Sequence, residues 1–175
     1  MKYLNQTEYI RSESDSLADV EALLEGSVFH VTKRAYWPAI QRSGAILPNS
    51  DGALETTFGS SRNSFFRNRG CVSVFDYRGE IDEEVIDCRR RCYPFQPALP
   101  GSDGIVVLFL NAVIHEHLLL WKLWQNEEAY GEMIVPRVEA GHLGPISLQL
   151  VDRAIFIRRT EDSQSLAAML RAARD

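Results

Sequence analysis

Two polar side chains stand in short apolar runs of the sequence, where each of them needs a partner. His30 lies in the run Val28–Val31, and a histidine on a buried strand must form a hydrogen bond with a protein group or with a ligand. Glu132 lies in the run 130–135, which we expect to be a strand, and a carboxylate there has the same requirement. Each residue is therefore a candidate for a binding or catalytic group, with a structural role as the alternative.

Three arginines, Arg62, Arg67 and Arg69, occur close together in the segment 60–69 between these two runs. A guanidinium group binds phosphate or carboxylate oxygens in a bidentate manner, so this segment could hold an anionic ligand. The alternative is a solvated loop that carries no ligand.

The elements that must position these residues are short and occur in mixed order. The apolar patterns predict about five strands and four helices separated by irregular loops, which indicates the α+β class. The expected strands are residues 28–31, 71–77, 105–110, 130–135 and 155–157. The expected helices are residues 7–25, 36–43, 81–92 and 163–173, and residues 111–124 could form a further helix.

A chain of 175 residues is long enough to bury one core, and no linker or internal repeat divides it. We therefore expect a single domain over residues 1–175. It would consist of an N-terminal helical segment (1–27), a core (28–157) and a C-terminal helix (158–175). Gly44 follows the second expected helix and is typical of a residue that ends one.

Composition excludes several function classes. The formal net charge of -5 gives no general attraction to nucleic acid or to an anionic membrane, although it leaves room for a local basic groove. No apolar run reaches the length of about 18–20 residues that a membrane span needs, and no secretory leader is recognisable. The three cysteines are typical of free thiols in a reducing cytosol, so we expect a cytoplasmic protein. The motif 115–117 (His-Glu-His) lacks the spacing of a zinc site, and we expect no metal.

Four motifs, in their order along the chain, resemble the ADP-ribosyltransferase superfamily. They are FHVT followed by PAIQRSGAILP, then SRNSFFRNRG, then CVSVFDYR, and finally EMIVP, which ends at Pro136. The resemblance covers about residues 28–157 and is nearest to the DarT-type, DNA-targeting toxins and related small bacterial transferases. It implies a small, mixed or antiparallel split β-sheet core with flanking helices.

The resemblance also implies a role for each candidate residue. NAD would be the substrate, and Glu132 would stabilise the cationic ribose that forms as the nicotinamide bond breaks. Arg67, with Arg62 next in preference, would hold the pyrophosphate. His30 and Thr32 would bind the adenosine side, and Tyr77 could stack on the nicotinamide ring, whereas Phe75 is expected in the core.

The acceptor of ADP-ribose is less defined by the sequence. The resemblance favours a nucleic acid, DNA or RNA, over a protein, and it is consistent with a toxin or defence enzyme that has an antitoxin partner. Tyr130 stands where protein-modifying relatives carry a second acid or a glutamine, which argues against transfer to arginine. The alternative is a catalytically silent domain of the same shape that binds a nucleotide, RNA or a protein. RNA 2′-phosphate transfer is a third possibility.

Overall fold

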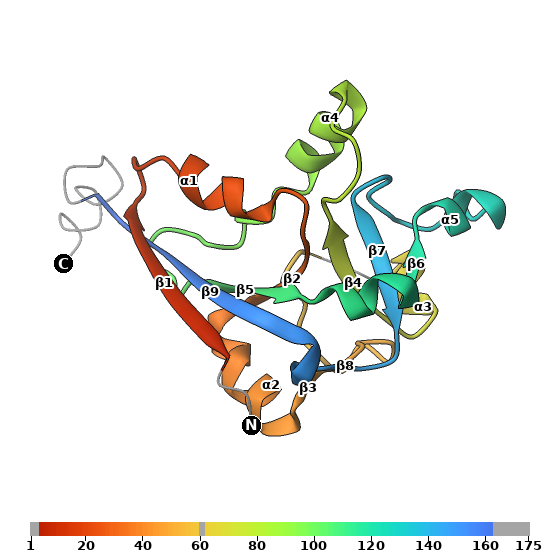
Figure 1. Cartoon of the computed structure of the whole chain (residues 1–175), viewed down its shortest axis with the longest axis horizontal. Helices are drawn as coiled ribbons and strands as arrows, with labels where there is room; N and C mark the ends of the chain where they lie inside the picture. Colours follow the sequence, from red (N-terminus) through yellow and green to blue (C-terminus); the bar gives the residue numbers. More distant parts are fainter. Residues whose placement is uncertain (1–3, 60–61, 163–175) are drawn as a thin grey trace.

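The computed structural model describes residues 4–59 and 62–162, and it has an α+β fold (Figure 1). The described strands form a seven-stranded sheet in the order β1-β9-β5-β2-β4-β7-β6 and a small sheet of β3 and β8. Within the described sheets, β1 and β9 pair in parallel and the other neighbours are antiparallel. The predicted class, a mixed and mostly antiparallel sheet with flanking helices, is confirmed.

The strands are short, apart from the pair at one edge of the large sheet. Their bounds are β1 Asn5–Ser12, β2 Val28–Lys33, β3 Ala45–Ile46, β4 Cys71–Asp76, β5 Ile105–Leu110, β6 Leu118–Leu120, β7 Glu139–Leu143, β8 Ile146–Ser147 and β9 Val151–Thr160. The α-helices are α1 Ala18–Glu21, α2 Trp37–Ser43, α3 Phe65–Asn68, α4 Glu83–Arg91 and α5 Lys122–Asn126. The 3-10 helices are η1 Ala22–Leu24, η2 Arg34–Tyr36, η3 Ala112–His117 and η4 Leu148–Leu150.

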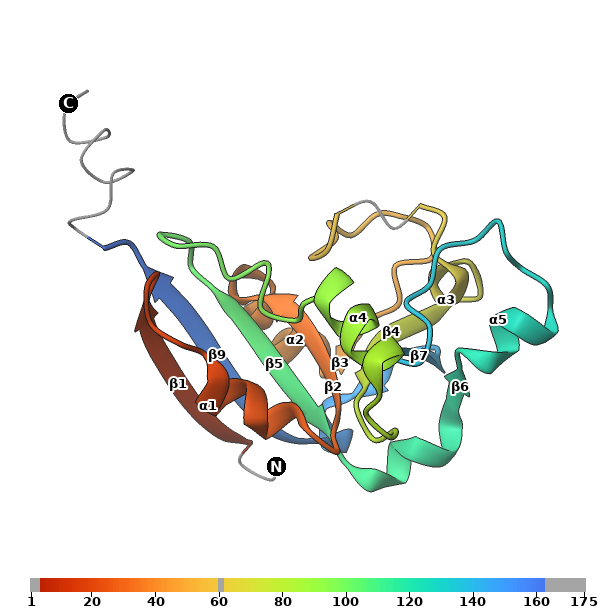
Figure 2. The same cartoon turned by 90° about the horizontal axis from the view of Figure 1, so that it is seen from above.

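The large sheet splits between β2 and β4. All six residues of β2 pair with β5, but only Val28 and Phe29 pair with β4. Beyond Phe29 the two strands separate, while β4 continues to pair with β7. Figure 2 shows β1, β9 and β5 grouped on one side of the molecule, and β4, β7 and β6 on the other.

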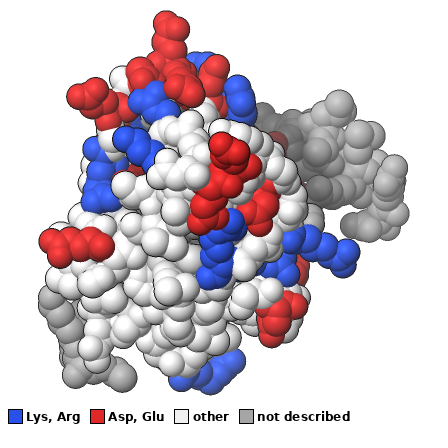
Figure 3. All heavy atoms as spheres, turned by 90° about the vertical axis from the view of Figure 1, so that its right-hand side faces the viewer, with Lys and Arg blue, Asp and Glu red and all other residues white. Residues whose placement is uncertain are grey.

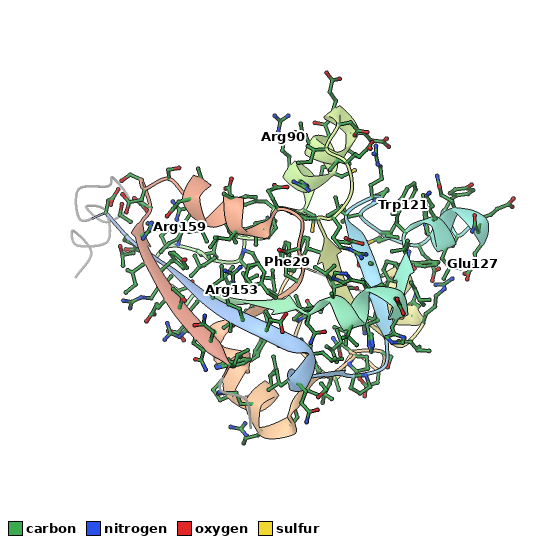
Figure 4. The ribbon with its side chains drawn as sticks, in the orientation of Figure 1. Phe29, Arg90, Trp121, Glu127, Arg153 and Arg159 are labelled. Atoms are coloured by element: carbon green, nitrogen blue, oxygen red, sulfur yellow. The ribbon has the colours of Figure 1, made fainter. Side chains whose placement is uncertain are left out.

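Each face of the sheet has its own apolar core. One face carries Phe29 and Ile155 and is covered by α1, α4 and the segment 93–98. The other carries Leu108 and Phe156 and is covered by α2 and η3. Helices α1 and α4 lie on the opposite side of the sheet from α2 in Figure 1. Figure 4 places Phe29, which is fully buried, at the centre of the molecule.

Several predicted elements are confirmed, and the ends of two follow the expected chemistry. Strands β2, β4 and β5 occur where the apolar runs predicted them, and β9 extends the predicted strand 155–157 in both directions. Helix α2 has Pro38 in its first turn, and it ends at Gly44, which has a left-handed φ of 70°. Helix α4 begins after Asp82, whose carboxylate accepts a hydrogen bond from the Val85 N–H.

The predicted helix over residues 7–25 is wrong in its first half. Residues Asn5–Ser12 form strand β1, and helical structure begins at Ala18 and ends at Leu24. Tertiary pairing decides the outcome, because all eight residues of β1 lie in register with β9. Side chains such as Tyr9 then alternate with the more exposed ones of this edge strand. The predicted C-terminal helix 163–173 lies outside the described residues.

Two further predictions fail between residues 111 and 135. Residues 111–124 do not form one helix, because β6 interrupts them to pair with β7. Residues 130–135 are not a strand of the sheet, since β7 occupies the place beside β4. In this segment Met133 forms one isolated bridge with Ser64.

Within the described residues, no helix is long and apolar enough to cross a membrane.

Candidate functional site

A cavity of about 580 Å³ opens where β2 and β4 separate. Residues of β2, α2, β4 and the loop 47–58 line it, together with the first residue of β7. Its volume falls in the range of small-molecule and cofactor sites, about 300–1,000 Å³. Most lining side chains are apolar, and the charged residues of the described lining are Glu55, Arg67 and Glu139.

His30 lies on the β2 wall of this cavity, one residue beyond the last pairing of β2 with β4. Its Nδ1 donates a hydrogen bond of 2.9 Å to the Ser73 carbonyl of β4 and so bridges the split. Burial lowers the pKa of His30, although the bond to Ser73 acts in the opposite sense. The ring is therefore neutral near pH 7, and its second nitrogen is a hydrogen-bond acceptor that suits a ligand hydroxyl.

Glu139, the first residue of β7, lies on the same wall of the cavity as Phe75. One of its carboxylate oxygens accepts a hydrogen bond of 3.0 Å from the Val135 N–H. Burial raises the pKa of Glu139, while the contacts with Val135 and the Ser73 hydroxyl favour the charged form and offset part of this effect. Ser73 therefore contacts His30 through its carbonyl and Glu139 through its hydroxyl, and a half-buried acid and a neutral imidazole line the same cavity.

Arg67 contributes a guanidinium group to the cavity from helix α3. The two phenylalanines before it, Phe65 and Phe66, are fully buried and fix the helix. The Arg67 Nε donates to the Asn49 carbonyl at 2.6 Å, which ties the loop 47–58 to α3. Gly52 of this loop has a φ of 76°, and a Cβ there would lie 2.4 Å from Arg67 Nη2, so the loop closes tightly over the arginine.

The phenylalanine side chains that line the cavity are Phe58 and Phe75, and the predicted stacking residue Tyr77 is not among the lining residues. Phe75 and Phe58 both line it, with ring centroids 5.6 Å apart in an edge-to-face arrangement. Tyr77 does not line it; the residue is 5% exposed and packs edge-on against Phe29 in the core. The Arg89 guanidinium lies 3.7 Å from the centroid of the Tyr77 ring, which closes off its other side. Tyr77 is thus a core residue and does not reach the cavity. The expectation that Phe75 lies in the core is confirmed, and Phe75 also lines the cavity.

Glu132 lies outside the cavity, in a surface cluster with Arg69 and Glu127. Its carboxylate accepts hydrogen bonds from Asn68 Nδ2 at 2.8 Å and from Arg69 Nη1 at 2.7 Å. Both contacts lower the pKa of Glu132. Arg69 also binds Glu127 at 2.5 Å and lies 3.6 Å from the ring centroid of Phe65.

This surface cluster joins the segment 127–133 to helix α3 through hydrogen bonds and ion pairs. Arg62 is exposed and does not line the cavity. Of the six residues that the sequence analysis selected, the structure brings together His30, Thr32 and Arg67, and it separates them from Glu132, Arg62 and Tyr77.

Glu139 was not among the predicted residues, because the expected strand 130–135 ended before Pro136. Val138 and Ala140, which flank Glu139, are fully buried, and a lone acid between two apolar residues is the signal that was available. A second missed group surrounds Tyr36, whose hydroxyl is buried and has no hydrogen bond of ordinary geometry within the described residues. Lys33 and Glu55 approach it and form an ion pair of 2.7 Å with each other.

A second hollow, of about 760 Å³, lies between β1, β9 and the start of α2. None of the six selected residues lines it. Its Arg34 is paired with Glu8 at 2.5 Å and lies over the ring of Phe156, so its charge is already balanced. Within the described residues, no group of three or more His, Cys, Asp and Glu could hold a metal ion.

Comparisons with known proteins add little to this picture. No family model matches the chain, and no curated protein matches it. Among solved structures, the crystal structure of protein CC0527 from Caulobacter crescentus is similar, with a TM-score of 0.40 and 15% sequence identity. The alignment covers 74% of this chain and 83% of that one. A similarity at this level carries no argument about function.

Proposed function

We propose that the protein is an NAD-dependent ADP-ribosyltransferase that binds NAD in the cavity between β2 and β4. The observation that carries this proposal is that the half-buried Glu139, the neutral His30 and Arg67 line the same cavity. In this proposal Glu139 takes the role that the sequence resemblance gave to Glu132. The acceptor is a macromolecule, and a role as a toxin or defence enzyme with an antitoxin partner belongs to the same proposal.

The charge of Glu139 suits the reaction. Burial makes the carboxylate costly to ionise in the empty cavity, and a positively charged nicotinamide riboside offsets that cost. The C1′–N bond of NAD breaks, its electron pair leaves with neutral nicotinamide, and the ribose becomes cation-like. A carboxylate next to the ribose stabilises this cation more than the ground state and so lowers the barrier. The acceptor then forms a bond to C1′ and loses a proton.

The remaining cavity residues bind and orient NAD in this proposal. Arg67 pairs with the diphosphate, which matches the bidentate geometry of a guanidinium group. His30 accepts a hydrogen bond from a ribose hydroxyl, and Thr32, which is 4% exposed, adds a hydroxyl to the same wall. Phe58 and Phe75 offer ring faces and edges to the nicotinamide.

One observation favours a second candidate, a catalytically silent domain that binds a nucleotide, RNA or a protein. Glu139 accepts a hydrogen bond from the Val135 N–H at the start of β7 and could serve only to fix that turn. A domain of this kind would bind its ligand without breaking a bond.

The test is NAD cleavage by the full chain, followed as nicotinamide release, for wild type, Glu139→Gln and Glu132→Gln. We expect Glu139→Gln to reduce the rate about 10²- to 10³-fold, the usual effect of removing a group that stabilises a charged transition state. Glu132→Gln is the matched control and should change the rate less than about threefold. An equal rate for Glu139→Gln and wild type would overturn the assignment, and no NAD binding at millimolar concentration would favour the silent domain.

A further inference from the structure

The mouth of the cavity carries exposed hydrophobic side chains from two separate segments. Leu47 and Leu54 come from the loop after α2, and Met133 comes from the segment before β7. All three line the cavity, yet they are 47%, 49% and 59% exposed. Large hydrophobic side chains that gather around an opening and remain in water mark a surface that another molecule covers.

The charges of the same cavity do not suit a polyanion. Its lining contains two carboxylates, Glu55 and Glu139, and one guanidinium, that of Arg67. Lys33, at the edge, is paired with Glu55 at 2.7 Å. Once Arg67 is committed to the diphosphate of NAD, none of the described lining residues offers a cation to a second phosphate. Phosphate contacts supply most of the affinity for nucleic acid, so DNA or RNA would gain little here.

The wider surface gives the same indication on the face that Figure 3 shows. Basic and acidic side chains alternate there in mixed groups, separated by large uncharged areas, and they form no continuous basic track on that face. The net charge of -5 agrees with this distribution. A nucleic-acid groove would need several cations in a row.

We propose that the acceptor of ADP-ribose is a protein, whose apolar side chain packs against Leu47, Leu54 and Met133 next to the modified residue. This inference rests on the proposed function, and it replaces the nucleic acid that the sequence resemblance favoured. Burial of an apolar anchor supplies binding energy without any charge, which matches an opening whose ions are paired or already committed. The two segments that carry these side chains both line the cavity, so one anchor at the cavity could contact both of them.

The test uses the full chain, NAD labelled with ³²P in its adenylate phosphate, and the total protein and total nucleic acid fractions of a bacterial lysate, each offered separately. We expect label in the protein fraction that protease releases and nuclease does not. Leu54→Asp and Met133→Asp should lower the ratio of transferred label to free ADP-ribose at least about tenfold. Val113→Asp is the matched control, because Val113 is 65% exposed but does not line the cavity, and it should leave this ratio unchanged.

The possible outcomes distinguish a failure of the protein acceptor from a failure of the proposed NAD-dependent activity. NAD cleavage together with nuclease-sensitive label, or with no label in either fraction, would overturn the protein acceptor and leave the transferase or NAD-cleaving activity standing. Equal ratios for wild type and both rim variants would also overturn it. Absence of NAD cleavage by wild type would overturn the proposed function and this inference with it.

Discussion

Two glutamates seven positions apart, Glu132 and Glu139, occupy opposite electrostatic environments. Glu132 lies at the surface, where Asn68 and Arg69 bind its carboxylate and lower its pKa. Glu139 lies in the wall of the cavity, where burial raises its pKa and no described guanidinium binds it. The first arrangement stabilises a charge that is present at all times, and it therefore suits a structural fastening. The second keeps a charge costly until a cation arrives, which is the property that catalysis at a cationic ribose needs.

The same contrast separates two arginines, Arg67 in helix α3 and Arg69 directly after it. Arg67 faces the cavity, whereas Arg69 belongs to the surface cluster with Glu127 and Glu132. We expect Arg67→Ala to weaken NAD binding about 10- to 100-fold, the loss of a charge-assisted hydrogen bond to phosphate. Arg69→Ala should change NAD affinity less than about twofold and lower the melting temperature instead. Isothermal titration with NAD measures the two affinities, and a thermal scan measures the melting temperature. Equal losses of NAD affinity in the two variants would contradict the distinction.

Phe58 and Tyr77 extend the comparison to aromatic residues. Phe58 lines the cavity, and Tyr77 is buried in the core. Phe58→Leu should raise the KM for NAD about three- to tenfold through loss of ring contact with the nicotinamide. Tyr77→Phe should leave KM and kcat within about twofold. A larger effect of Tyr77→Phe than of Phe58→Leu would restore the stacking role to Tyr77.

The raised pKa of the half-buried Glu139 implies a cost in folding stability, and this cost depends on pH. The folded-state pKa of Glu139 is raised, so below pH about 4 the carboxyl is protonated in both states and has no such effect. As pH rises, the unfolded chain loses the proton first, and folding becomes less favourable. Glu139→Gln removes this penalty, and we expect its melting temperature at pH 8 to exceed that of wild type by about 2–4 °C. Thermal scans at pH 4 and pH 8 check the difference, which should vanish at pH 4.

Glu132→Gln should show the smallest effect, with the opposite sign. The folded-state pKa of Glu132 is lowered, so its stabilisation is present above the unfolded pKa and is lost as pH falls through the folded pKa. We expect a decrease of at most about 2–4 °C in melting temperature at pH 7, which becomes smaller as pH falls through the folded pKa, because exposed ion pairs contribute about 0–1 kcal/mol. A melting temperature at pH 7 above that of wild type would contradict the fastening role.

The α+β class and the strands with uninterrupted apolar runs could be predicted from sequence, as β5 illustrates with six buried residues. The failures share one physical cause: tertiary pairing overrides local pattern. The residues of β1 are a strand because β9 binds them, and residues 130–135 are not one because β7 already lies beside β4. His30 stood out because it is a polar group on an apolar run, and Thr32 and Arg67 were selected through the resemblance; all three line the cavity. Glu139 was missed because the expected strand ended before it, and its place in the cavity follows from the pairing of β7 with β4.

The most direct measurement is amide chemical-shift mapping of the full chain as NAD is added. We expect the shifts to concentrate at His30, Ser73, Arg67 and Glu139, which lie on β2, β4, α3 and β7. We expect no comparable change at Arg69 or Glu132. Shifts confined to the surface cluster around Glu132, or none up to millimolar NAD, would contradict the claim that the cavity between β2 and β4 is the NAD site.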